Sequence, residues 1–197
     1  MRIKVLVQAA VNYSKQIMNF EKFRMAFEEI QKRIELPEYL KAICTKLSTE
    51  KTEIDVNKIL NRCGINDSIA KVDFLHLIFE YIKLSLEDDL LTNEERDHIR
   101  YLKKIFHIQP GDFQLHISLQ VERVITFQLS KIYEDDFVTP HEALLKVDLQ
   151  ELFDLSFDQM NEYSKKEAIV SIQNGAEAED LDVFFTYTEY FKLKSAI

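Results

Sequence analysis

Glycine and proline are scarce in this sequence, with three of each among 197 residues. Both lie far below average usage, which argues against an all-β fold with many tight turns and favours long helices. Hydrophobic residues make up 46% of the chain, enough to bury a sizeable core. We therefore expect an all-α multi-helix bundle, built as one domain or as one domain with an appendage.

Catalytic signatures are missing as well. The sequence has no Gly-rich phosphate loop, no nucleophile elbow and no His-Glu-x-x-His. Its histidines are scattered, which is typical of surface or hydrogen-bonded core histidines. Paired carboxylates perform acid–base chemistry only where an apolar pocket raises the pKa of one of them, and none is evident here. We expect a non-enzymatic protein, with a hydrolase of unrecognised signature as an alternative.

Cysteine and long apolar runs are also rare. Cys44 and Cys63 have no CxxC spacing, which is typical of reduced thiols in a cytoplasmic protein. No run approaches the length that spans a bilayer. The apolar stretch Val5–Val11 is interrupted by Gln8 and lacks a clear cleavage site, so no secretory signal peptide is expected. These features together predict a cytoplasmic location.

The charge of −9 makes nucleic acid an unexpected partner. It is uneven, because residues 1–36 carry a net +3 and residues 37–197 carry −12. Near the N-terminus a stripe at helical spacing predicts an amphipathic helix. We expect this helix to pack in the core rather than on a membrane, since it lacks Trp and its basic excess is small. The stripe consists of Ile3, Leu6, Ala10, Tyr13, Ile17 and Phe20.

One acidic stretch occurs twice. The segments Glu87–Phe113 and Glu134–Met160 align without a gap, 47 residues apart, and seven of 27 positions are identical, against roughly two by chance. Apolar residues upstream match at helical spacing. The predicted unit is helix, acidic loop, helix, used twice. The identities lie at Glu87, Asp88, Asp89, Thr92, Glu95, Leu102 and Phe106.

The repeated residues suit a helix start. Thr92 with Glu95, and Thr139 with Glu142, form Thr-x-x-Glu, the capping box in which each side chain bonds the other residue's backbone N–H. Pro140 stands at the first helical position, where its missing N–H costs nothing. Capping and the helix dipole explain the threonines and glutamates, and they explain the aspartates in part.

A second interpretation of the same loops is a cation site. Adjacent carboxylates repel one another, and a hard cation with oxygen ligands such as Mg²⁺, Mn²⁺ or Ca²⁺ relieves that repulsion. Glu95, Glu142 and His141 would contact the ligands rather than the cation itself. The predicted ligands are Asp88, Asp89, Asp135 and Asp136.

The two loops resemble the motif of the TerB-like family, roughly Ala-Asp-Gly-x-Ile-Ser-x-x-Glu and often present twice. That all-helical family includes tellurite-resistance proteins and the N-terminal domain of a membrane-anchored co-chaperone. The resemblance covers about half of the chain and implies a helical, stress-related binding protein. Asp89 and Asp136 replace the motif's Gly, and Asp tolerates the left-handed backbone that Gly adopts there. The matching residues are Asp88, Leu91, Thr92 and Glu95, then Asp135, Val138, Thr139 and Glu142.

These patterns predict N-terminal helices over 1–66, a TerB-like repeat core over 67–175 and an aromatic tail over 176–197. In the tail, residues 181–193 fit a helix or a strand, and helix is favoured because a lone strand has no pairing partner. Its aromatic side chains predict docking on the body or on another chain, a second copy in a homodimer included. The expected function is weak binding of a divalent cation at the acidic loops. The alternative is a metal-independent adaptor whose partner is another protein.

Overall fold

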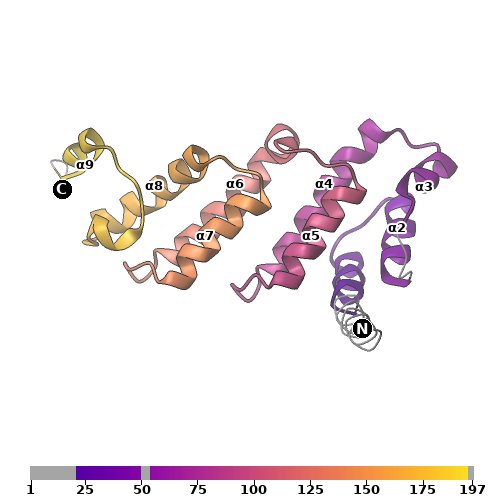
Figure 1. The fold of residues 1–197 in the computed structure, drawn as a ribbon, viewed down its shortest axis with the longest axis horizontal. Helices are drawn as coiled ribbons and strands as arrows, with labels where there is room; N and C mark the ends of the chain where they lie inside the picture. The colour runs from indigo at the N-terminus through magenta and orange to yellow at the C-terminus, as the bar shows by residue number, and fades with distance from the viewer. Residues whose placement is uncertain (1–20, 50–53, 195–197) are drawn as a thin grey trace, which may run out of the picture. The chain divides into compact units, whose positions relative to one another are not determined.

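The computed structural model describes residues 21–49 and 54–194, and in them the regular secondary structure is helical. The all-α prediction is confirmed. The predicted amphipathic helix of the first 20 residues lies outside the described residues. The helices are residues 21–33, α2 (Glu38–Thr49), α3 (Val56–Cys63), α4 (Asp67–Ser85), α5 (Asn93–Ile105), α6 (Asp112–Ile132), α7 (Pro140–Leu152), α8 (Phe157–Gln173) and α9 (Tyr187–Lys194), with a 3-10 turn, η1 (Ala178–Leu181) (Figure 1).

The described chain divides into two compact units at a place that the sequence did not indicate. Unit 1 holds the residues up to Asp88 together with Thr92–Ile108, and unit 2 holds Asp89–Leu91 and everything from Gln109 onward. The predicted boundaries after residues 66 and 175 stay a prediction. In unit 1, α2 packs on α3 and α4 packs on α5, and the division lies just before the Pro110-Gly111 turn, where Gly111 has φ 89°.

Unit 1 is organised around α4, which packs against α5. Phe74 of α4 stacks on Phe106, with ring centroids 4.2 Å apart and planes 7° from parallel. Helix 21–33 packs on α4 and α5 through Phe23, whose ring contacts those of Tyr81 in α4 and His98 in α5. The Tyr81 hydroxyl and His98 Nδ1 are 2.6 Å apart, so this buried histidine is hydrogen-bonded, as predicted for a core histidine.

Unit 2 is organised around α6, which packs on both α7 and α8. Phe113 and Phe153 are fully buried and meet edge to face at 5.6 Å. Val121, Ile125 and Leu129 continue the buried stripe at four-residue steps. Because α6 contributes this stripe along its length, α7 and α8 can pack on it as neighbours and present their other faces to solvent.

The two acidic loops have matching local geometry. Each spans seven residues, from the C-cap of one helix to the Thr N-cap of a 13-residue helix, α5 or α7. Both predicted capping boxes are present. Asp89 and Asp136 have φ 57° and 61°, as predicted from the Gly of the family motif. Superposition of the two helix–loop–helix segments as equivalent halves stays a prediction.

Asn66 caps α4, accepting from the Ser68 N–H at 2.8 Å.

The helix favoured for residues 181–193 is present only in part. The chain forms η1, then an irregular stretch from Asp182 to Thr186, and becomes helical only at Tyr187. The Asp182 backbone, at φ 46°, stops the 3-10 turn, and Thr186 starts the next helix.

Candidate functional site

The acidic loops use much of their charge in local contacts. Asp89 forms an ion pair with Lys131, and Asp135 Oδ1 accepts from the Phe137 N–H at 3.3 Å. Glu95 and Glu142 each accept from the backbone N–H of their Thr cap at 2.8 Å. His141 is exposed. Within residues 21–49 and 54–194, no three His, Cys, Asp or Glu side chains gather in a way that would hold a metal. Cation binding by Asp88, Asp89, Asp135 and Asp136 stays a prediction.

A third capping box of the Thr-x-x-Glu type lies one further 47-residue step along the chain, where the sequence had not led us to expect one. The Thr186 N–H donates to Glu189 at 2.7 Å, and the Glu189 N–H donates to the Thr186 hydroxyl at 3.4 Å. Thr92, Thr139 and Thr186 are equally spaced, as are the glutamates that follow them. The spacing of the threonines and glutamates therefore indicated a cap at Thr186. Residues 174–185 have little similarity to the two acidic loops, so the alignment of those loops did not extend to this cap.

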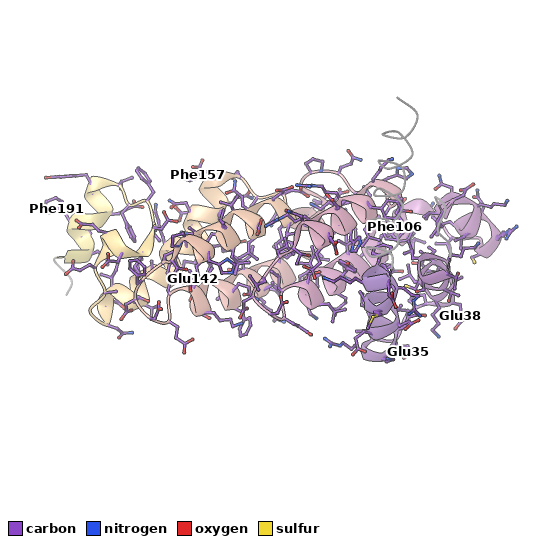
Figure 2. All side chains as sticks on the ribbon, turned by 60° about the horizontal axis from the view of Figure 1, so that its bottom comes forward. Glu35, Glu38, Phe106, Glu142, Phe157 and Phe191 are labelled. Carbon is purple, nitrogen blue, oxygen red and sulfur yellow. The ribbon has the colours of Figure 1, made fainter. Side chains whose placement is uncertain are left out.

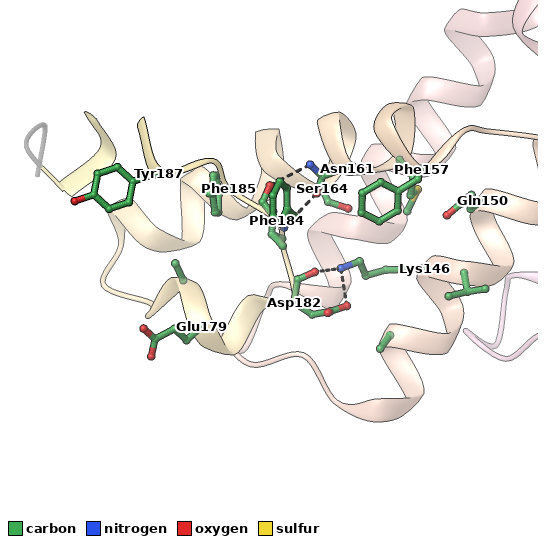
Figure 3. A pocket seen from close by; sticks show the side chains of 15 residues that line it. Lys146, Gln150, Phe157, Asn161, Ser164, Glu179, Asp182, Phe184, Phe185 and Tyr187 are labelled. Carbon is green, nitrogen blue, oxygen red and sulfur yellow. Dashed lines mark hydrogen bonds and ion pairs between the residues drawn. The ribbon is translucent and has the colours of Figure 1, made fainter. Parts of the chain in front are cut away.

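A groove in unit 2 has a volume of about 740 Å³ (Figure 3). Two helices form its walls, and each contributes residues at the i, i+3, i+4 and i+7 positions of one face. The chain between η1 and α9 closes the third side. We call residues 182–186 the strap. The wall residues are Ala143, Lys146, Val147 and Gln150 from α7 and Phe157, Met160, Asn161 and Ser164 from α8.

Apolar side chains remain exposed around this groove. Val147 of α7 is 59% exposed, and Phe157, labelled in Figure 2 at the start of α8, is 64% exposed. From the third side, Phe184 and Tyr187 are 62% and 79% exposed. Single exposed apolar residues are ordinary, but a group that borders one concavity is typical of a binding surface.

Lys146 places a charge inside this apolar surface. Its side chain is 10% exposed, and its ammonium donates to the Asp182 carboxylate at 3.0 Å and to the Asp182 carbonyl oxygen. The same ammonium lies 5.7 Å from the centre of the Tyr133 ring, a favourable cation–π distance. In the 47-residue register Lys146 stands where Ile99 is buried in unit 1. A lysine at an otherwise core position is a signal that the sequence offered.

The Asn161 side chain binds the backbone of the strap. Its Nδ2 donates to the Phe184 carbonyl oxygen at 3.0 Å, and its Oδ1 accepts from the Phe184 N–H at 3.2 Å. Both bonds are drawn in Figure 3. A carboxamide that pairs with both backbone groups of one residue recognises extended chain independently of its side chain, since every non-proline residue offers the same pair.

The α8 wall of the groove carries a buried hydroxyl that can form a further hydrogen bond. Ser164 is 2% exposed, and its hydroxyl has no well-aligned hydrogen-bond partner among the described residues. The Tyr133 hydroxyl is also buried and also has no well-aligned hydrogen-bond partner among the described residues. Burial raises the Tyr133 pKa, against a smaller lowering effect of the nearby Ser164 hydroxyl, so the phenol stays protonated at neutral pH. The wall thus offers a hydroxyl beside an ammonium, a pairing suited to a carbonyl or carboxylate oxygen.

This arrangement is suited to binding. The lysine and aspartate in the groove neutralise one another, and the remaining polar residues are the carboxylate of Glu179 together with amides and hydroxyls set among apolar side chains. Such a surface can hold apolar side chains and pair with an extended backbone. No helix in the described part of the chain is long and apolar enough to cross a membrane. Comparison with family models, with curated proteins and with solved structures finds no match for this chain.

Proposed function

We propose that this chain is a non-enzymatic binding module that takes a segment of a partner protein into the groove between α7 and α8. The observation that carries the proposal is the pairing of exposed apolar residues, Val147 and Phe157, with the backbone-binding amide of Asn161 in one concavity. Apolar contacts supply affinity, and amide pairing to the backbone fixes the direction of the bound chain.

Other parts of the proposal rest on different residues. Cys44 and Cys63 carry free thiols, which supports a cytoplasmic protein. Burial raises the Cys44 pKa to about 12, so that thiol is an inert part of the core. The TerB-like resemblance, a stress-related role and tellurite resistance stay predictions, because they depend on the loop motif alone. The groove does not depend on that motif.

Selection of peptides on the whole protein tests the proposal. A displayed library of random peptides is enriched on the native chain, and the enriched peptides are then measured on two variants. Val147→Asp places a charge on the rim of the groove. Val170→Asp is the matched control, since Val170 is 54% exposed on α8 but does not line the groove.

We expect Val147→Asp to weaken binding at least tenfold and Val170→Asp to leave it unchanged. Each substitution introduces the same charge into an exposed helical position, so their difference reports the groove. Enriched peptides that bind both variants equally well would contradict the proposal, as would a library that yields no binder.

A further inference from the structure

The strap already occupies part of the groove, and the contacts that hold it differ from those that hold the chain just before it. Leu181, the last residue of η1, is fully buried, and the Asp180 carbonyl oxygen accepts from the Val138 N–H at 2.9 Å. Beyond Leu181, Phe184, Tyr187 and Phe191 are each more than half exposed, while Val183 and Phe185 are half-buried. Leu181 is therefore the last fully buried side chain before the strap.

Polar contacts hold the strap and the start of α9. Lys146 binds Asp182, Asn161 binds the Phe184 backbone, and Lys165 binds Glu189 at 2.9 Å. Each contact exchanges with water when it breaks, so its net contribution is small. A segment attached mainly by such contacts opens locally at far lower cost than the core. The strap can leave the groove while η1 stays in place.

We propose that the strap is an internal stand-in for the partner, and that the partner contributes an extended acidic and aromatic segment that replaces it. This inference rests on the proposed function and deepens it by naming the chemistry of the ligand. Lys146 selects an acidic side chain, as it now does with Asp182. Asn161 takes the backbone two residues later, as it does with Phe184. Phe157 and Val147 then meet the aromatic side chains of the bound segment.

The electrostatics of the groove favour the same occupant. Lys146 and Lys165 are 10% and 12% exposed, and both are held at the groove or beside it by carboxylates of the C-terminal region. When that region leaves, each ammonium loses a carboxylate partner, and Lys165 keeps its pairing with Glu162. An incoming carboxylate replaces the ion pair that Lys146 has lost, whereas a neutral peptide does not. The Ser164 hydroxyl lines the α8 wall of the groove and can donate to an oxygen of the bound segment.

The test uses a fluorescent peptide with the sequence of residues 180–191 and the full-length chain. In one variant of the chain the strap is weakened by Asp182→Asn and Glu189→Gln, which leave the groove walls intact. Asn tolerates the left-handed backbone at position 182, so the turn is kept. A matched control, Asp158→Asn together with Glu177→Gln, removes the same charge elsewhere in unit 2.

We expect the strap-weakened variant to bind the peptide at least tenfold more tightly than the native chain, because apparent affinity scales with the fraction of molecules whose groove is open. The charge control should bind like the native chain. Lys146→Met in the weakened background should abolish the gain. A peptide whose Asp182 equivalent is replaced by Asn should bind more weakly than the parent.

Several results would overturn the inference. Equal affinities for the native and weakened chains would show that the strap does not compete for the groove. Absence of binding to every variant would show that the groove does not take this segment. A dimer in light scattering that the peptide dissociates would identify a second copy of the chain as the occupant. If displayed peptides depend on Val147 but carry neither acid nor aromatic residues, the inference fails and the proposed function stands.

Discussion

The loop between α6 and α7 and the chain between α8 and α9 end in the same way but are built differently. Both reach a Thr-x-x-Glu capping box, at Thr139 and at Thr186, and a helix begins one residue later. The first connection has seven residues and the second has thirteen, residues 174–186. The shared cap determines where the second helix of each pair starts. It does not determine the length or the path of the connection before it.

The extra length of the second connection creates the groove. In the short loop Val138 is buried, one residue before the Thr139 cap. In the long one η1 is anchored by Leu181, and the strap then crosses in front of α8. A change in loop length can thus form a concave surface beside two packed helices, since surface loops tolerate insertions well.

Removing the anchor of the long connection should have the largest effect. Leu181→Ala deletes a fully buried side chain and should lower the free energy of unfolding by about 2–5 kcal/mol, whereas Phe184→Ala, on the exposed strap, should change it by less than about 0.5 kcal/mol. Urea unfolding followed by circular dichroism measures both. Similar losses for the two variants would show that the strap is part of the core.

Removing the caps should separate the two connections further. Thr92→Ala and Thr139→Ala should each cost about 1 kcal/mol of global stability, as is typical of a lost N-cap. Thr186→Ala should leave global stability unchanged and accelerate amide hydrogen exchange in α9 alone, because that helix opens by itself. If neither Thr92→Ala nor Thr139→Ala changes stability, these threonines do not start helices in solution.

Acid should release α9 before it unfolds the body. The hydrogen bonds from Thr186 and then Lys165 lower the Glu189 pKa to about 2, from the ordinary value of 4.5. The contribution of the ionised carboxylate to α9 is therefore complete above pH 4.5 and is lost as the pH falls toward 2. Hydrogen exchange of α9 between about pH 5 and about pH 2, corrected for intrinsic rates, checks this. Glu189→Gln should remove the pH dependence, and an unchanged profile in that variant would contradict the assignment.

The smallest effect concerns cations at the two short loops. Any Mg²⁺, Mn²⁺ or Ca²⁺ held by Asp88, Asp89, Asp135 and Asp136 would keep most of its water, so the Kd should lie at about 10⁻⁴–10⁻³ M. Asn at all four positions keeps size and turn propensity while removing the charge. Calorimetry with each cation should give heats for the native chain only. Equal heats from both proteins would remove the cation hypothesis.

The helices were largely predictable because their signals are local. The caps at Thr92 and Thr139 follow from four-residue motifs. The positive φ of Asp89 follows from its place at the Gly of the family motif. The cap of α4 at Asn66 is less predictable, because three consecutive residues can each cap a helix and the sequence does not decide between them.

The groove was not predictable by the same means. It depends on which faces of α7 and α8 meet, and on a connection whose path is set by the burial of Leu181 and the Asn161 amide rather than by local propensity. The division of the chain at Gln109 has the same origin, since it depends on which helices pack together. Clustered charge makes the acidic loops conspicuous in the sequence. Ordinary residues such as Val147 and Met160 give no comparable signal of a groove.

The exposed strap also has a consequence for the lifetime of the protein in the presence of proteases. An endoprotease must draw several residues of extended chain into its own cleft, and surface segments held by few contacts are cut first. Phe184 and Tyr187 offer aromatic cleavage sites in such a segment. A cut there would remove most or all of α9 and leave Leu181 in place, so the product would be a trimmed protein whose remaining strap ends in a free terminus. Cleavage would then act on this molecule as a permanent form of opening, and a bound partner would protect the chain against it only if the partner covered the same bonds.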